Sequence, residues 1–137
     1  MTHLLDSSAV LAFYLDEPGA NRVDQLLSSP GVSIAISVLT LYEISAAVKH
    51  RTGSVQSSKE AVAELRQSIT IVKEVTESIV DLGIELRRNA TDHIALADCL
   101  IAATALNYGL VLVHRDPHFS ALTLTELSQE MLPAKSP

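Results

Sequence analysis

Short apolar segments alternate with helix-length segments along the whole chain of 137 residues. The apolar segments, mostly rich in β-branched residues, lie at residues 4–5, 32–36, 69–72 and 110–113. Between them, helices are expected at residues 7–12, 20–27, 38–51, 57–67, 76–89 and up to Gly109. This alternation predicts an α/β protein, a three-layer α/β/α domain with a mostly parallel central sheet of four to five strands, the fifth at residues 122–124.

The composition fits one domain that spans residues 1–137. Hydrophobic residues make up 47% of the chain, which is enough for a substantial core, and residues 133–137 are expected to form a flexible tail. The single cysteine, Cys99, excludes an intrachain disulfide. We find no basic segment of a signal peptide and no apolar run of the ~18 residues that span a bilayer, so we expect a cytoplasmic protein without membrane contact.

Asp98 is the one charge in the otherwise apolar run of residues 94–106, so its carboxylate is expected to point toward the interior. An unpaired carboxylate there would cost several kcal/mol. Three other acids have similar surroundings. Asp6 and Asp116 follow expected strands at the carboxyl edge of the sheet, where ligands gather in such folds. Glu43 and Asp98 lie early in helices and can face the same edge.

Four carboxylates brought together without matching Lys or Arg residues would repel one another. A divalent cation removes that cost, and Mg²⁺ and Mn²⁺ are the hard ions that favour carboxylate and water oxygens. Such an ion lowers the pKa of a bound water and offsets charge on a phosphoryl group, which is the chemistry of phosphodiester hydrolysis. The acids therefore predict a metal-dependent hydrolytic site.

Each acid also has a simpler interpretation. Asp6 can cap a helix, Glu43 can extend to solvent, and Asp116 can begin a turn. Asp98 can be buried with hydrogen-bond partners and no metal. Ser8 is expected to act as a hydrogen-bond donor to the metal site.

A zinc site is not predicted from the histidines. His114 and His118 flank Asp116 at alternate positions, but Pro117 interrupts the regular strand that would place them on one face. The chain has no cysteine cluster and no H-E-x-x-H spacing. No Gly-rich phosphate loop or G-x-S-x-G motif is present either.

Four segments carry a family resemblance, in order along nearly the whole chain. They are residues 5–9 (LDSSA), 41–44 (LYEI), 96–105 (LADCLIAATA) and 110–119 (LVLVHRDPHF). With them the chain resembles the PIN-domain proteins, specifically the VapC-like ribonuclease toxins of bacterial toxin–antitoxin pairs. The resemblance implies Mg²⁺- or Mn²⁺-dependent cleavage of RNA, with Asp6, Glu43, Asp98 and Asp116 as the catalytic and metal-binding residues.

The last segment departs from the family pattern. PIN domains commonly have Thr or Ser in place of His114 and often a further acid in place of His118, which leaves the second metal and the water network open. The resemblance also implies a small antitoxin whose tail enters the acidic groove, and a homodimer. The apolar stripes expected to serve these contacts are Leu11, Tyr14 and Leu15, or Val23, Leu26 and Leu27.

The formal charge of −6 is opposite to the broad basic surface of proteins that grip nucleic acid by counterion release. RNA contacts are therefore expected from a few local cations only. The candidates are Arg115, residues 49–51 and residues 87–88, while His114 is a candidate either for supporting the site or for contacting RNA.

Three alternatives remain open. The chain can be a housekeeping PIN nuclease in RNA maturation, or a catalytically silent PIN-like binding module, which the histidines at positions 114 and 118 slightly favour. The third is a receiver-type signalling domain, which is also small, acidic and α/β. A receiver needs paired acids after the first strand and a late-strand lysine, whereas Asp6 has no acidic neighbour and Val113 is followed by His-Arg.

Overall fold

The computed structural model describes residues 1–134, so most of the expected tail, residues 135–137, lies outside the described part of the chain. The strands are β1 (His3–Leu5), β2 (Ile34–Ser37), β3 (Ile71–Lys73), β4 (Val111–His114) and β5 (Gln129–Met131). The helices are α1 (Ser7–Tyr14), α2 (Ala20–Ser28), α3 (Val38–Thr52), α4 (Val55–Ser68), α5 (Glu77–Arg88) and α6 (Leu96–Tyr108), with a 3₁₀ helix η1 (Pro117–Ala121). Within residues 1–134, none of the helices has the length and apolar character needed to cross a membrane.

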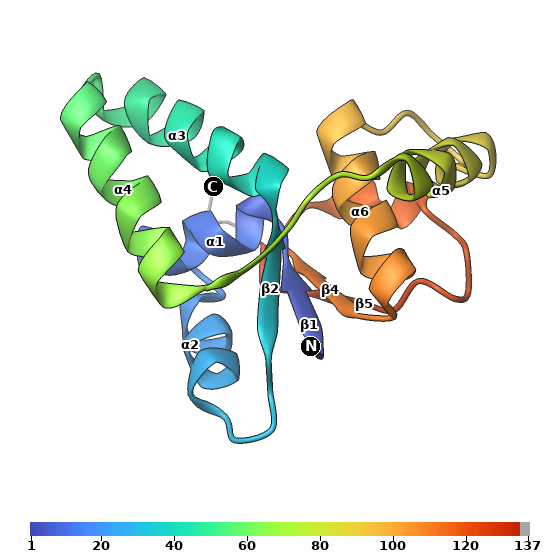
Figure 1. Ribbon diagram of the computed structural model, residues 1–137, viewed down its shortest axis with the longest axis horizontal. Helices are drawn as coiled ribbons and strands as arrows, with labels where there is room; N and C mark the ends of the chain where they lie inside the picture. Colours follow the sequence, from blue (N-terminus) through green and yellow to red (C-terminus); the bar gives the residue numbers. More distant parts are fainter. Residues whose placement is uncertain (135–137) are drawn as a thin grey trace.

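The five strands form one parallel sheet in the order β3-β2-β1-β4-β5, which confirms the predicted fold class (Figure 1). From β1 the chain adds β2 and then β3 on one side. It then crosses back to place β4 and β5 on the other side of β1. The strand order therefore reverses between β1 and β4. In open parallel sheets this switch point, at the carboxyl ends of the strands, is where ligand crevices form.

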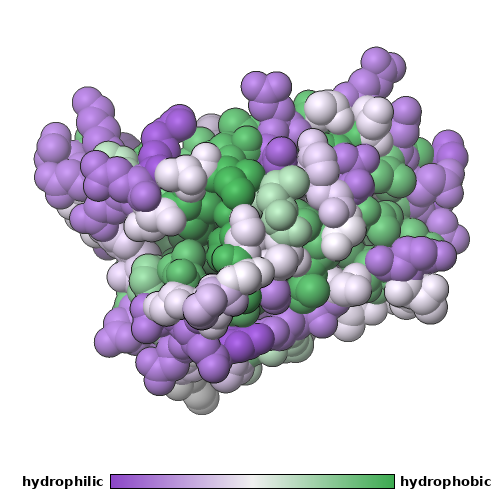
Figure 2. All heavy atoms as spheres, turned by 60° about the horizontal axis from the view of Figure 1, so that its bottom comes forward, coloured by the Kyte–Doolittle hydropathy of each residue, from purple (hydrophilic) through white to green (hydrophobic). Residues whose placement is uncertain are grey.

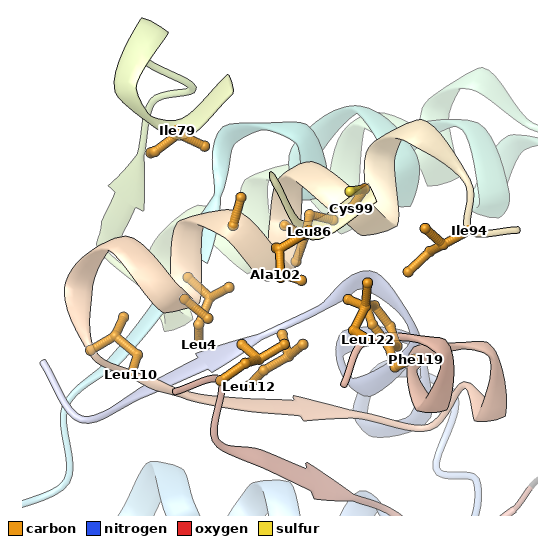
Figure 3. Close-up of a cluster of buried hydrophobic side chains, with 14 of the residues drawn as sticks. Leu4, Ile79, Leu86, Ile94, Cys99, Ala102, Leu110, Leu112, Phe119 and Leu122 are labelled. Atoms are coloured by element: carbon orange, nitrogen blue, oxygen red, sulfur yellow. The ribbon is translucent and has the colours of Figure 1, made fainter. Parts of the chain in front are cut away.

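The sheet carries a hydrophobic core on each face. Because neighbouring residues of a strand point to opposite faces, Leu4 and Leu112 enter one core while Leu5 and Val113 enter the other. Helices α5 and α6 cover the first core, in which Leu4 and Leu112 lie opposite Ala102 of α6 (Figure 3). Residues of α1, α2, α3 and α4 supply the helical side of the second. The α6 helix is thereby fixed above β1 and β4.

The fifth strand was expected at residues 122–124, and that prediction is wrong. Leu122 is instead buried in the core beneath α6, beside Phe119 (Figure 3). The strand that pairs with β4 is β5, whose three residues are largely exposed. Backbone bonds from Leu112 N to Ser128 O (2.9 Å) and from Leu132 N to His114 O (2.7 Å) flank it. Backbone pairing at a sheet edge leaves no apolar pattern in the sequence.

Three of the predicted strands end one residue later than expected. Ser37, Lys73 and His114 continue the backbone pairing although their side chains are polar. The helix boundaries agree to within a few residues, and Gly53 and Gly109 end α3 and α6 in the left-handed conformation.

Candidate functional site

Asp6 follows β1 directly and is also the N-cap of α1. Its Oδ1 accepts a hydrogen bond from Ala9 N at 2.8 Å, so the capping interpretation is correct, and it places the carboxylate at the switch point. The residue is only 2% exposed. Burial raises the pKa of Asp6 to about 7. The charges of Asp98 and Asp116 also raise this pKa, whereas the hydrogen bonds to the carboxylate lower it.

Glu43 lies in the second turn of α3 and is partly buried. The hydroxyl of Ser7, the first residue of α1, donates to Glu43 Oε1 at 2.5 Å, and the same hydroxyl lies 3.4 Å from Thr40 Oγ1. The structure therefore ties Glu43 to the residue next to Asp6. The sequence did not single out Ser7 for this role, and its position directly after Asp6 was the only available signal.

Asp98 is the third residue of α6. Because the helix begins at Leu96 and not at residue 94, Asp98 lies in the first turn and is only partly buried; the expectation that it points into the interior is wrong. Within residues 1–134 its carboxylate makes no hydrogen bond to the protein. Burial first, and then the charges of Glu43 and Asp116, raise the pKa of Asp98 to about 6.

Asp116 lies two residues beyond β4 and is the N-cap of η1. Its Oδ1 accepts from His118 N at 2.9 Å, so this carboxylate does begin a turn, as the simpler interpretation held. The same oxygen lies 3.0 Å from Nδ1 of the exposed His118 side chain. Asp116 thus caps η1 and also lies just beyond β4, the strand that pairs with β1.

The four predicted acids form one electrostatic cluster. Charge repulsion acts between Asp6 and Asp98, between Asp6 and Asp116, and between Asp98 and both Glu43 and Asp116. Among the described residues, His118 is the only basic side chain within 4.0 Å of a carboxylate of the cluster, that of Asp116, and this contact is ionic only when the imidazole is protonated. In residues 1–134, no three His, Cys, Asp or Glu side chains are arranged closely enough to form a ready-made metal cage. The cluster is therefore a group of carboxylates near one another with little balancing charge from the protein.

Ser8 connects two of the loops that carry these acids. Its hydroxyl donates to the Asp6 carboxylate, at 2.7 Å from Oδ1 and 2.9 Å from Oδ2. The same oxygen accepts from Arg115 N at 2.8 Å. Ser8 therefore holds the loop after β1 against the loop after β4.

Arg115 is largely buried and has partners within the protein. Its side chain is 6% exposed, and its guanidinium donates to Glu17 Oε1 at 3.1 Å and to Pro18 O at 3.3 Å. The structure therefore pairs Arg115 with the loop between α1 and α2, and its expected contact with RNA stays a prediction. The sequence could not reveal this partner, which lies 98 residues earlier.

Three other candidate cations also have partners within the protein. Arg51 lies 4.0 Å from Glu17, Arg87 donates to Ile94 O at 2.7 Å, and Arg88 pairs with Glu85 at 3.1 Å. Lys49 and His50 are exposed near the end of α3. The local cations available to a nucleic acid are thus fewer than the sequence suggested.

A polar hollow of about 290 Å³ adjoins the cluster. It lies between the loop after α5 and the η1 helix, and is lined by Thr91, Asp92, His93, Pro117, His118, Ser120 and Ala121. His118 belongs both to this hollow and to the ion pair with Asp116. The acids therefore stand beside a surface recess into which an extended ligand can continue.

The fold is that of known toxin–antitoxin structures. A chain of the VapBC2 complex from Rickettsia felis superposes with a TM-score of 0.77 at 20% identity, over 97% of this chain and 100% of that chain. FitAcB from Neisseria gonorrhoeae gives 0.72 at 23%, covering 93% and 96%. VapC20 of Mycobacterium tuberculosis, described as a toxin that cleaves the sarcin-ricin loop, gives 0.69 at 22%, covering 93% and 99%. A search of curated proteins finds no match.

The sequence itself matches one family model. The match is to the PIN domain and extends over residues 3–123, from β1 to beyond η1. That range contains all four acids of the cluster and the whole sheet except β5. The chain belongs to the PIN domain family.

Proposed function

We propose that this chain is a divalent-metal-dependent ribonuclease, which hydrolyses RNA phosphodiester bonds as the toxin of a toxin–antitoxin pair. Membership of the PIN family supports the proposal. So does the fold shared with toxin–antitoxin complexes and with a toxin described as cleaving the sarcin-ricin loop. The observation that carries it is the gathering of Asp6, Glu43, Asp98 and Asp116 at the switch point of the sheet.

The donor chemistry of the site fits Mg²⁺ or Mn²⁺. All four acidic groups offer oxygen, and Asp98 has no hydrogen-bond partner among the described residues. Mg²⁺ keeps several waters and uses few protein ligands, so it does not need a closed cage of three side chains. The four carboxylates would hold such an ion directly or through water. When bound, the ion would lower the pKa of a water and offset charge on the phosphoryl group.

The residues of the chain would orient the reacting groups for in-line attack by water. Ser8 and Ala9 N fix the Asp6 carboxylate, and Ser7 fixes Glu43, so these two acids are held in place before RNA arrives. The Asp98 carboxylate makes no hydrogen bond within residues 1–134, so we assign to it the hydrogen bond to the attacking water. In this mechanism no carboxylate attacks the phosphorus itself.

The RNA would make few ionic contacts with the protein. The net charge of −6 disfavours tight nonspecific binding, and most of the candidate arginines have protein partners. In this proposal, the nucleotides next to the scissile phosphate would bind in the recess beside His118. A short single-stranded segment fits this arrangement better than a long duplex.

Cleavage of labelled single-stranded RNA by the purified protein in Mg²⁺ or Mn²⁺ tests the proposal. We expect cleavage of the RNA, and little cleavage of DNA of the same sequence. Equal cleavage of both polymers would contradict the assignment of RNA as substrate. Absence of any cleavage would favour the catalytically silent binding module.

We propose that the antitoxin binds an apolar groove on one face of the protein. A small hollow of about 60 Å³ opens between α1, α2 and α4, and its lining includes Phe13, Tyr14, Val23, Leu27 and Leu65. Apolar side chains reach the surface in the middle of one face of the molecule, with hydrophilic side chains around them (Figure 2). We assign the groove to an apolar segment of the antitoxin, with its tail continuing to the acids.

Tyr14→Glu is expected to abolish neutralisation by the antitoxin while leaving RNA cleavage intact. Tyr14 is 40% exposed at the groove, so a charge placed there would lose its hydration when an apolar segment binds. The measurement is growth on co-expression with a short reading frame adjacent to the gene, with Val55→Glu, at a residue that is 53% exposed outside the groove, as the control. Neutralisation of both variants would contradict the groove assignment. Absence of such a reading frame would favour the housekeeping nuclease.

One of the two apolar stripes expected to serve the homodimer, the one on α2, does not fit that role. Val23 and Leu26 are buried in the core, and the remaining residue of the α2 stripe, Leu27, lines the groove that we assign to the antitoxin. Val80 and Ile84 of α5 and Leu96 of α6 are exposed, Leu96 to 69%, around a hollow of about 340 Å³. We propose that this face joins two copies. Light scattering should then give twice the mass of 14.7 kDa, and a monomer would contradict it.

A further inference from the structure

His114 ends β4 at the point where a typical PIN domain would carry a hydroxyl. Its ring is not at the surface: the residue is 2% exposed and packs against Phe119, with 4.5 Å between ring centroids. The imidazole therefore does not reach RNA. Both of its nitrogens are engaged inside the protein.

The partners of the ring define its protonation state. Asp116 N donates to His114 Nδ1 at 3.2 Å, so Nδ1 must be the unprotonated nitrogen. The proton then lies on Nε2, which donates to Gln129 Oε1 at 2.9 Å. A ring that accepts at one nitrogen and donates at the other is neutral.

Gln129 orients the ring from the other side. Its amide oxygen is directed to His114 and its amide nitrogen donates to Leu122 O at 3.3 Å, which fixes which way the amide points. Gln129 begins β5, and β5 is held to β4 by backbone pairing. The chain of hydrogen bonds therefore runs from Leu122 O through Gln129 and His114 to the backbone of Asp116.

We propose that His114, oriented by Gln129, is a positioning residue that fixes the backbone of Asp116 and so aims its carboxylate at the acidic cluster. The inference rests on the proposed nuclease function for its effect on activity. Residues that orient a metal ligand typically affect activity or metal affinity about 10- to 100-fold. The imidazole thus joins the backbone of Asp116 to β5.

Two substitutions at position 114 separate positioning from simple packing. The side-chain oxygen of Asn and the Nδ1 atom of His are the same number of bonds from Cα. The Asn side chain of His114→Asn can therefore still accept a hydrogen bond from Asp116 N. His114→Leu fills the site with an apolar side chain and cannot accept. Positioning predicts that Leu lowers kcat about 10- to 100-fold, and that Asn retains several times more activity than Leu. A packing role alone predicts the reverse order, because the site is buried.

Two further variants complete the activity experiment. Gln129→Leu should lower kcat in the same direction as His114→Leu, because the ring then loses its orienting partner. Thr104→Val is the control: Thr104 is fully buried and donates only to Leu100 O within its own helix. Folding of each variant is checked by circular dichroism and thermal unfolding. Equal activity of the Asn and Leu variants, or wild-type activity of both Leu variants, would overturn the proposal.

The tautomer can be measured without any activity. Long-range ¹H–¹⁵N spectra of the imidazole should show a neutral His114 ring with its proton on Nε2, and Gln129→Leu should change the Nε2 signal. A proton on Nδ1 would overturn the inference. If the wild type cleaves no RNA, the nuclease proposal fails, whereas the tautomer result still decides whether His114 supports Asp116.

Discussion

Asp98→Asn is expected to remove RNA cleavage, by about 100-fold or more, while the protein remains folded. The loss follows from charge, because Asn keeps the size of the side chain but takes one anion from a cluster that we propose to hold a divalent ion. Asp98 makes no hydrogen bond to the protein within residues 1–134, so the substitution breaks no structural contact there. The fold should even gain stability, because burial and neighbouring charges penalise the ionised carboxylate.

The measurement is cleavage of labelled RNA at saturating Mg²⁺ or Mn²⁺, with circular dichroism as the test of folding. Asp81→Asn is the matched control, since Asp81 is an exposed acid on α5 outside the cluster. Undiminished cleavage by a folded Asp98→Asn protein would contradict the assigned role of Asp98. Equal loss in the Asp81 variant would show that the effect is not specific to the cluster.

Asp6→Asn is expected to stabilise the metal-free protein at pH 8 and to abolish cleavage. Burial raises the pKa of Asp6 to about 7 in the folded protein, against an ordinary value of 3.8, so the folded state binds the proton more tightly than the unfolded state. The favourable contribution of this protonation is complete below pH ~4 and is lost as the pH rises through 7. The ionised form then costs on the order of 4 kcal/mol. Asn avoids that cost and is itself a good N-cap.

Denaturant unfolding at pH 4 and pH 8 without metal measures this effect. The variant should exceed the wild type by a few kcal/mol at pH 8, and the difference should shrink toward zero at pH 4. Asp24→Asn, at an exposed position on α2, is the control. If the variant is less stable than the wild type at pH 8, burial of the ionised Asp6 carboxylate does not destabilise the folded protein. Added Mg²⁺ should raise the melting temperature of the wild type and not of Asp6→Asn.

The fold was predictable because the central strands are buried. Parallel strands covered on both faces read as short apolar runs, and β1, β2 and β4 were located in this way. β3 is an edge strand of partly buried residues, and its β-branched residues Ile71 and Val72 revealed it. The fifth strand was missed because β5 lies at the sheet edge, with exposed side chains, and is defined by backbone pairing alone. Periodicity carries no information about such a strand.

The acids of the site were predictable for a related reason. Asp6 and Asp116 follow buried strands, and the alternation of elements places the ends of parallel strands on one edge. The supporting contacts were not predictable, because they join distant parts of the chain. Arg115 was expected to contact RNA but pairs with Glu17, and the role of His114 depends on Gln129, a residue in the strand that the sequence concealed.

We propose that four carboxylates of this PIN domain hold a divalent ion for RNA hydrolysis. The most direct measurement is cleavage of labelled RNA by the wild-type protein in excess chelator, and then after Mg²⁺ or Mn²⁺ is restored. An Asp98→Asn preparation, purified in the same way, controls for contaminating ribonuclease. We expect no cleavage of RNA in excess chelator. When metal is restored, cleavage should return in the wild type and not in the Asp98→Asn preparation. Cleavage that continues undiminished in excess chelator would contradict the proposal.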